Sequence, residues 1–123
     1  MNNRIKELAR ERAQFAYKKV KEVVKEKKID PKDYRSYLKK IPTYLQTNGL
    51  AATIAFIFAK KKSAYGVIYN QIDEWLQKIQ MKNNTPLIEW VVELESPTYR
   101  RATKEIIALL MWMGRFAEGM VDK

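Results

Sequence analysis

Apolar side chains recur at intervals of three and four residues along almost the whole chain, the spacing that places them on one face of an α-helix. The pattern contains no internal repeat and leaves only short connections, so we expect an all-α, compact single-domain bundle of about six helices with a long N-terminal helix, spanning residues 1–123. The expected helices cover residues 3–27, 31–40, 42–60, 65–79, 86–94 and 97–120.

Helix starts are indicated by three prolines that each follow a residue able to cap a helix, namely Asp30-Pro31, Thr85-Pro86 and Ser96-Pro97. A side-chain oxygen at the cap accepts a free backbone N–H, and proline in the first helical position has no N–H to leave free. The fourth proline, Pro42, follows Ile41, and a residue before proline avoids the helical conformation. We therefore predict a break or kink at Pro42.

The segment after Asn48-Gly49 is ambiguous, because Asn-Gly favours a hairpin and residues 53–58 have a strand-like composition. A single hairpin would have no sheet to join, so a helix is preferred. Gly49 inside that helix would cost about 1 kcal/mol relative to alanine, which suggests a close helix crossing there. The first helix is expected to bury Ile5, Leu8, Ala9, Ala16, Val20, Val23 and Val24. Trp75, Trp90, Trp112, Met111, Met113 and Met120 are assigned to packing by their spacing.

Composition excludes most catalytic chemistry. The 123 residues include no Cys and no His, which removes disulfides, thiolate zinc sites and the usual general base. The acidic residues do not converge in the pattern that a metal-dependent nuclease needs, and no glycine-rich phosphate loop is present. We expect a protein that is not an enzyme and has neither a metal site nor a cofactor.

The chain also lacks the features of membrane insertion or export. Its opening residues carry no apolar signal-peptide stretch, and the longest nearly apolar run, residues 50–59, is too short to cross a bilayer. A cytoplasmic protein without membrane contact is expected.

Positive charge is concentrated in the first half of the chain. The net charge is +10, whereas residues 64–96 hold only two basic and five acidic residues. In the first helix, one exposed stripe ends in Lys18, Lys21, Lys25 and Lys28, a row of about 15 Å at 1.5 Å per residue. This row suits a phosphate backbone, but taken alone it is better explained as a solvated face whose lysines complement the helix dipole.

Three further basic groups are candidates for binding an anion. Lys60, Lys61 and Lys62 follow a predicted helix end, where the dipole alone also favours cations. Arg100, Arg101 and Lys104 lie at a predicted helix start, where the dipole disfavours them; either a partner anion or pairing with Glu93 or Glu95 would compensate. Lys39 and Lys40, before Pro42, form the third group.

Two stretches carry a resemblance to a known family. The first is Lys40-Ile41-Pro42, Leu45, Asn48-Gly49-Leu50 and Thr53-Ile54-Ala55-Phe56. The second is Tyr99-Arg100, Thr103, Glu105, Ala108-Leu109-Leu110, Trp112 and Arg115-Phe116-Ala117-Glu118. In this order, they resemble the small α-helical subunit of the type III-B (Cmr) CRISPR RNA-guided effector complex.

The resemblance implies a non-catalytic, six-helix subunit that stacks in copies beside the backbone subunits holding the CRISPR RNA. Its basic face would line the channel of the guide–target RNA duplex, while another subunit cuts RNA. The implied partners are the CRISPR RNA and target RNA backbones, the other Cmr subunits and further copies of the chain. Within the matched stretches, Lys40, Arg100 and Arg115 would contact RNA, and Asn48 and Gly49 would be structural or subunit-packing positions.

Charge adds two residues to the expected packing surface, because acidic Glu89 and Glu93 of one copy could meet a basic surface of the next. The complete set of expected RNA-binding residues is Lys18, Lys21, Lys25, Lys39, Lys40, Lys60, Lys61, Lys62, Arg100, Arg101, Lys104 and Arg115. Two alternatives stay open: a free-standing basic helical nucleic-acid-binding regulator, and a helical adaptor for acidic protein surfaces. The effector-complex subunit is favoured over the regulator, because no helix offers Asn, Gln and Arg together on one exposed face that could read bases in a groove.

Overall fold

Six α-helices connected by short turns make up the computed structural model, which describes residues 2–121. The helices are α1 (Asn2–Glu26), α2 (Pro31–Asn48), α3 (Leu50–Ala59), α4 (Ala64–Lys78), α5 (Leu87–Val92) and α6 (Ser96–Met120). No residue in this range forms a strand. The predicted all-α fold with a long first helix is confirmed, and residues 50–59 form a helix rather than part of a hairpin.

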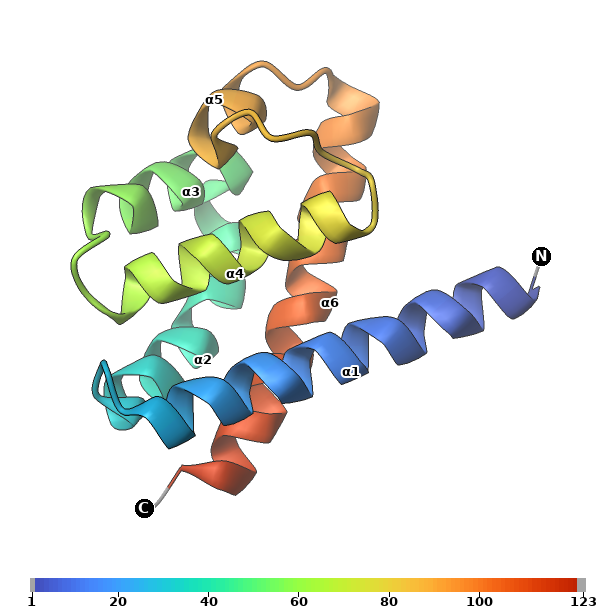
Figure 1. The fold of residues 1–123 in the computed structure, drawn as a ribbon. Coiled ribbons are helices and arrows are strands. Elements are labelled where there is room, and N and C mark those ends of the chain that lie inside the picture. The colour runs from blue at the N-terminus through green and yellow to red at the C-terminus, as the bar shows by residue number, and fades with distance from the viewer. Residues whose placement is uncertain (1, 122–123) are drawn as a thin grey trace.

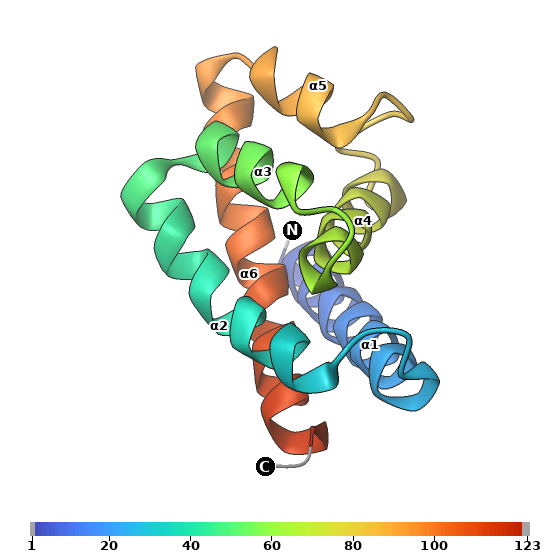
Figure 2. The same ribbon diagram turned by 90° about the vertical axis from the view of Figure 1, so that its left-hand side faces the viewer.

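The helices are arranged around α6, which runs through the length of the molecule (Figure 1). Both α1 and α2 pack along α6, while α3 packs against α2, α4 and α5. Figure 2 shows α2 and α6 side by side, with α5 at one end of the molecule and the last turns of α1 toward the other. Every helix contributes side chains to the buried core, and Trp75 and Tyr34 are its largest fully buried members.

The predicted helix break at Pro42 is wrong, because α2 continues through Pro42 and ends at Asn48. Proline removes one backbone donor, but Ile41 and Leu45 on either side are almost fully buried. Their burial keeps this part of α2 against the core and outweighs the local preference. The predicted ranges 31–40 and 42–60 are therefore replaced by α2 and α3.

The break lies instead at Gly49, which has φ 88° and ψ 170°. A positive φ is readily adopted only by glycine, so backbone conformation is the main reason for glycine at this position. The backbone N–H of Gly49 donates to the carbonyl of Leu45 at 2.9 Å, and its own carbonyl accepts from Thr53. A Cβ here would lie 3.4 Å from the Tyr99 hydroxyl, an ordinary van der Waals distance, so the close helix crossing expected from the sequence is not the reason for glycine.

One of the three predicted helix caps is confirmed. Asp30 accepts a hydrogen bond from the backbone N–H of Lys32 at 2.9 Å, with Pro31 as the first helical residue. The other two starts are shifted by one residue: α5 begins after Pro86, and α6 begins at Ser96. The Glu95 carbonyl accepts from Tyr99 N–H at 2.8 Å, so the turn closes on the backbone without the Ser96 side chain.

The buried face of α1 differs from the prediction at its beginning. Ile5 is 70% exposed, because the first turns of α1 extend beyond the other helices (Figure 1). Phe15, which the spacing did not select, is buried and lies against Trp75 with ring centroids 5.0 Å apart. The middle and end of α1 bury Ala16, Val20 and Val23 as expected.

Two buried polar contacts connect distant helices. Glu105 on α6 accepts two hydrogen bonds from Arg12 on α1, at 2.6 and 2.9 Å, and one from the Trp75 indole on α4 at 2.8 Å. The Tyr34 hydroxyl on α2 donates to Gln71 on α4 at 2.8 Å, and burial raises the pKa of Tyr34 above its ordinary value near 10. Each contact satisfies polar groups that the core removes from water.

Candidate nucleic-acid interface

All the predicted RNA-binding lysines and arginines are exposed. Within residues 2–121, Lys39 is the one member of this set with a carboxylate at salt-bridge distance, its ammonium lying 2.6 Å from Glu118. Pairing of Arg100, Arg101 or Lys104 with Glu93 or Glu95, the alternative considered from the sequence, is absent from that part of the chain. These three cations are therefore available to an external anion.

Other basic residues serve internal contacts instead. The Arg12 guanidinium binds Glu105, and the Lys19 ammonium lies 2.7 Å from Glu74 on α4. Burial alone would lower the pKa of Lys19, but the hydrogen bond and charge of Glu74 outweigh it and raise that pKa. Lys19 thus joins α1 to α4 while its neighbours Lys18 and Lys21 are exposed to solvent.

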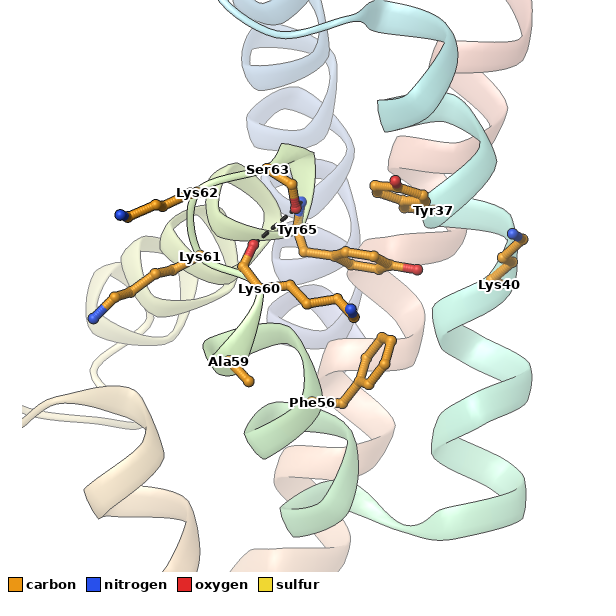
Figure 3. A pocket seen from close by; sticks show the side chains of 9 residues that line it. All are labelled: Tyr37, Lys40, Phe56, Ala59, Lys60, Lys61, Lys62, Ser63 and Tyr65. Carbon is orange, nitrogen blue, oxygen red and sulfur yellow. Dashed lines mark hydrogen bonds between the residues drawn. The ribbon is translucent and has the colours of Figure 1, made fainter.

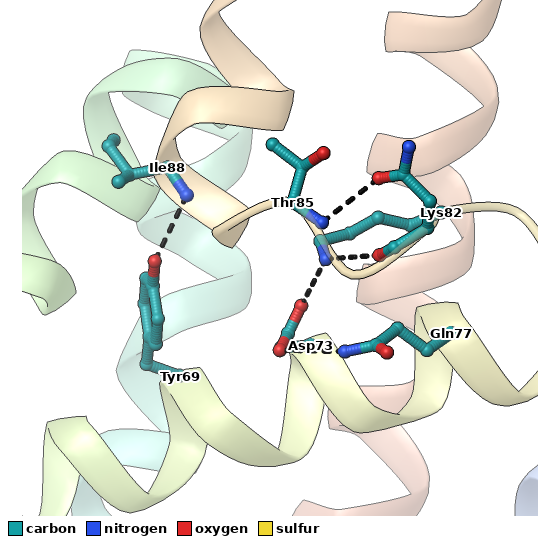
Figure 4. A network of polar contacts seen from close by, with 7 residues as sticks. Tyr69, Asp73, Gln77, Lys82, Thr85 and Ile88 are labelled. Carbon is teal, nitrogen blue, oxygen red and sulfur yellow. Dashed lines mark hydrogen bonds and ion pairs between the residues drawn. The ribbon is translucent and has the colours of Figure 1, made fainter.

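Lys82 also makes internal contacts, in the loop between α4 and α5. Its buried ammonium lies 2.6 Å from Asp73 and donates to the Asn83 carbonyl at 2.7 Å (Figure 4). Nearby, the backbone N–H of Ile88 donates to the Tyr69 hydroxyl at 3.0 Å. These contacts fasten the loop before α5 to α4, so Lys82 contributes to the fold rather than to the basic surface.

One hollow collects predicted bases from two distant segments. This basic hollow, about 600 Å³ in volume, lies where the end of α3 and the start of α4 face α2. Figure 3 shows its lining residues, Tyr37, Lys40, Phe56, Ala59, Lys60, Lys61, Lys62, Ser63 and Tyr65. Lys40 from the middle of α2 thus joins the Lys60–Lys62 turn, a juxtaposition that no sequence spacing indicates.

Aromatic rings form the inner wall of the basic hollow. Tyr37 and Tyr65 are stacked, with centroids 3.8 Å apart and planes inclined by 2°, and Phe56 meets Tyr65 edge-on at 5.2 Å. The Lys60 ammonium lies 5.4 Å from the Phe56 centroid, and that of Lys40 lies 6.0 Å from the Tyr37 centroid. Burial raises the pKa of Tyr65, with further contributions from Tyr37 and Tyr44, so the Tyr65 hydroxyl stays neutral and does not oppose an anion here at neutral pH.

Arg100 and Lys104 lie at the other end of α3. They line a small, largely apolar hollow of about 290 Å³ with Gly49 and Tyr99. The Tyr99 hydroxyl accepts a hydrogen bond from the backbone N–H of Ala51 at 2.9 Å, which fixes the first turn of α6 to the start of α3. Because α3 has ten residues, about 15 Å separates this group from the basic hollow.

Lys39 and Arg115 both line a groove of about 490 Å³ between α2 and α6. Arg115 also lies over the ring of Trp112, which stacks on Phe116. The Phe116 ring in turn contacts Tyr17 on α1 edge-on, and the Lys21 ammonium lies 5.8 Å from the Tyr17 centroid. The structure therefore connects part of the α1 stripe to Arg115. Lys18 and Lys25, on the same helix, are exposed.

The aromatic and methionine assignments are only partly correct. Trp75 and Met113 are fully buried as expected. Met111 is 49% exposed and lines the α2–α6 groove, so its assignment to the core is wrong. The sequence pattern did not indicate that Tyr37 and Phe56 reach the surface beside lysines. Helical spacing identifies the apolar face of a helix but not which residues lie at the edge of that face.

Acidic Glu89 and Glu93 are exposed, as expected, on α5 and directly after it. Helix α5 lies at the opposite end of the molecule from the last turns of α1 (Figures 1 and 2). Residues 2–121 contain no group of three acidic side chains placed to hold a metal ion. No helix in the described range has the length and hydropathy that a membrane span requires.

Comparison with known proteins gives consistent similarities. The family described as CRISPR-associated protein (Cas_Cmr5) matches residues 8–120. A Thermus thermophilus protein called CRISPR system Cmr subunit Cmr5 is 30% identical over 111 residues, or 90% of this chain and 93% of that protein. The X-ray crystal structure of a CRISPR-associated Cmr5 family protein, also from Thermus thermophilus, superposes with a TM-score of 0.77 at 28% identity, covering 94% of this chain and 97% of the other.

Proposed function

The chain belongs to the Cmr5 family of CRISPR-associated proteins, and from this membership we propose that it is a non-catalytic subunit whose basic surface holds RNA in a type III-B effector complex. Its whole length would act as one unit, without a cofactor, in the cytoplasm. The observation that carries the RNA-binding part is the set of exposed lysines and arginines that, within residues 2–121 and with the exception of Lys39, lack a carboxylate partner.

Holding RNA in this way needs no reactive group. Contacts from Lys and Arg to phosphate position a strand without reading its sequence, while pairing between guide and target supplies specificity. In the proposed complex, the CRISPR RNA and its target run past the basic hollow, the Arg100–Lys104 group and the Lys39–Arg115 groove. Cleavage is then performed by a different subunit.

Replacing Arg100 and Arg101 with glutamate tests this proposal. Both side chains are exposed and have no carboxylate partner among residues 2–121, so we expect the fold to change in stability by no more than about 0.5 kcal/mol per site. Target-RNA binding by the assembled complex should weaken. The slope of the logarithm of the binding constant against the logarithm of salt concentration should become shallower by roughly 0.7 to 0.9 for each phosphate that is no longer neutralised. Filter binding between low and high salt measures this slope.

A double variant Lys32→Glu/Lys78→Glu is the matched control. It changes the charge by the same amount at exposed positions outside the predicted set. If both double variants alter the salt slope equally, net charge rather than contact explains the effect. If Arg100→Glu/Arg101→Glu binds with the original slope, these arginines do not contact RNA.

We further propose that copies of the chain stack through unlike charges. Glu89 and Glu93 lie at the end of the molecule opposite the basic last turns of α1, so one copy presents an acidic end to the basic end of the next. Such a head-to-tail contact propagates as an open stack. Asn48 and Gly49, at the turn between α2 and α3, would be structural positions or would pack against a neighbouring subunit in this proposal.

Charge reversal at Glu89 and Glu93 tests the stack. With both residues changed to lysine, we expect the assembled complex to contain fewer copies of this chain, because like charges across an interface repel. Native mass spectrometry of the complex measures the stoichiometry, with Glu7→Lys/Glu11→Lys near the start of α1 as the control. Unchanged stoichiometry in the Glu89/Glu93 variant would refute this contact.

A further inference from the structure

We propose that the basic hollow binds an unpaired nucleotide of RNA, its base lying against the rings of Tyr37 and Phe56 and its phosphate held by Lys40 and Lys60. The inference rests on the RNA-holding function proposed above and specifies the form of RNA that this hollow takes. It differs from simple backbone contact because it assigns a role to the aromatic wall.

The first argument is unpaired charge. Lys40, Lys60, Lys61 and Lys62 line one hollow, and within residues 2–121 none of them lies within 4 Å of a carboxylate. The carbonyl end of α3 accounts for lysines at 60–62 through its dipole. It does not account for Lys40, which comes from the middle of α2 and lines the same opening (Figure 3). Cations that gather from separate helices repel one another, and a bound anion relieves that repulsion.

The second argument is the aromatic wall. Tyr65 is buried and holds the stacked Tyr37 and the edge-on Phe56, both half-buried, at the wall of the hollow. A phosphate alone has no planar group that could stack on these rings, and neither has a glutamate side chain of another protein. A nucleotide carries both a planar base and a phosphate, and the volume of about 600 Å³ falls within the roughly 300–1,000 Å³ of small-ligand sites.

The third argument concerns what the base would replace. In this structure the Lys60 ammonium lies over Phe56 and that of Lys40 over Tyr37. An exposed cation–π contact contributes less than the stacking of a base on an aromatic ring. A base can therefore take the ring face while the flexible lysine turns to the phosphate, so that neither group is left without a partner. A base within a duplex is already stacked and paired, which favours an unpaired nucleotide.

The test uses the full chain with 13C-labelled Tyr and Phe, titrated with an adenylate hexamer of RNA and with an abasic hexamer that keeps the sugar-phosphate chain. We expect the NMR signals of the Tyr37 and Phe56 rings to shift with the adenylate hexamer and not with the abasic one. The backbone amides of residues 60–62 should shift with both. This comparison requires no variant and so does not depend on a variant folding.

Variants then measure the contribution of the rings. Tyr37→Leu/Phe56→Leu should weaken binding of the adenylate hexamer by about fivefold or more, while leaving the abasic hexamer unaffected. Phe58→Leu is the matched control, since Phe58 lies on the same helix under Lys61, at 5.2 Å, but outside the hollow. It should leave both affinities unchanged.

Three results would overturn the inference. Equal affinity for the two hexamers would mean that the hollow holds phosphate only, and ring shifts of the same size with a hexaglutamate peptide would mean that it holds acidic protein. Shifts confined to the amides of Arg100 and Arg101 would remove the hollow from RNA binding while leaving the proposed function intact. Failure of the proposed function is distinct, because it appears as an unchanged salt slope in the assembled complex.

Discussion

Glu105→Ala should lower the free energy of unfolding by about 3–5 kcal/mol, the largest effect among the substitutions proposed for this protein. The substitution leaves the Arg12 guanidinium without its carboxylate and the Trp75 indole N–H without an acceptor, both in the interior between α1, α4 and α6. An unpaired buried charge is much more costly than the pair is stabilising. Urea unfolding followed by tryptophan fluorescence measures the effect.

Two comparisons isolate this mechanism. Glu105→Gln keeps an oxygen that can accept from Trp75 but removes the charge that faces Arg12, so its destabilisation should be smaller than that of the alanine variant. Glu89→Ala, at an exposed position on α5, should stay within about 0.5 kcal/mol of the parent protein. If Glu105→Ala were as mild as Glu89→Ala, the buried contact would have no structural importance.

Gly66→Ala is expected to have the second largest effect. A Cβ at Gly66 would overlap the carbonyl oxygen of Lys61 and lie 2.6 Å from its carbonyl carbon, so the backbone of the turn between α3 and α4 must move. Overpacking of this kind typically costs about 1–3 kcal/mol, and more where backbone is displaced. Because this turn carries Lys60, Lys61 and Lys62, the basic hollow should be disturbed as well.

Gly114→Ala is the matched control, since Gly114 also lies inside a helix, but outside its own helix backbone no atom of the described residues comes within 4 Å of an added Cβ. Alanine there should stabilise the protein by up to about 1 kcal/mol through helix propensity. Thermal unfolding of both variants, with amide NMR spectra of residues 60–63, measures stability and local change. Equal stability of the two variants would show that the α3–α4 turn can move away from the added Cβ without a loss of stability.

The candidate site could be predicted in its charges but not in its geometry. Exposure of Lys40, Lys60 and Arg100 follows from where they stand relative to the apolar spacing, and the structure confirms it. Spacing alone does not place the rings beside these cations, because Tyr37 and Phe56 are half-buried at positions that also border the core. Whether such a ring lies at the centre or at the rim of a helix contact depends on the neighbouring helix, which local spacing does not contain.

Local patterns in the chain were enough to specify the helical class, the long first helix, the Asp30 cap and the excess of exposed positive charge, because these depend on contacts within a few residues. Packing between distant segments was needed to establish that α2 passes through Pro42, and that Glu105 contacts Arg12, 93 positions away in the sequence. The same packing brought Lys40 to the turn at residues 60–62. The physical reason is that burial of a helix face, worth several kcal/mol, outweighs local preferences, and the partners it brings together are separated along the chain.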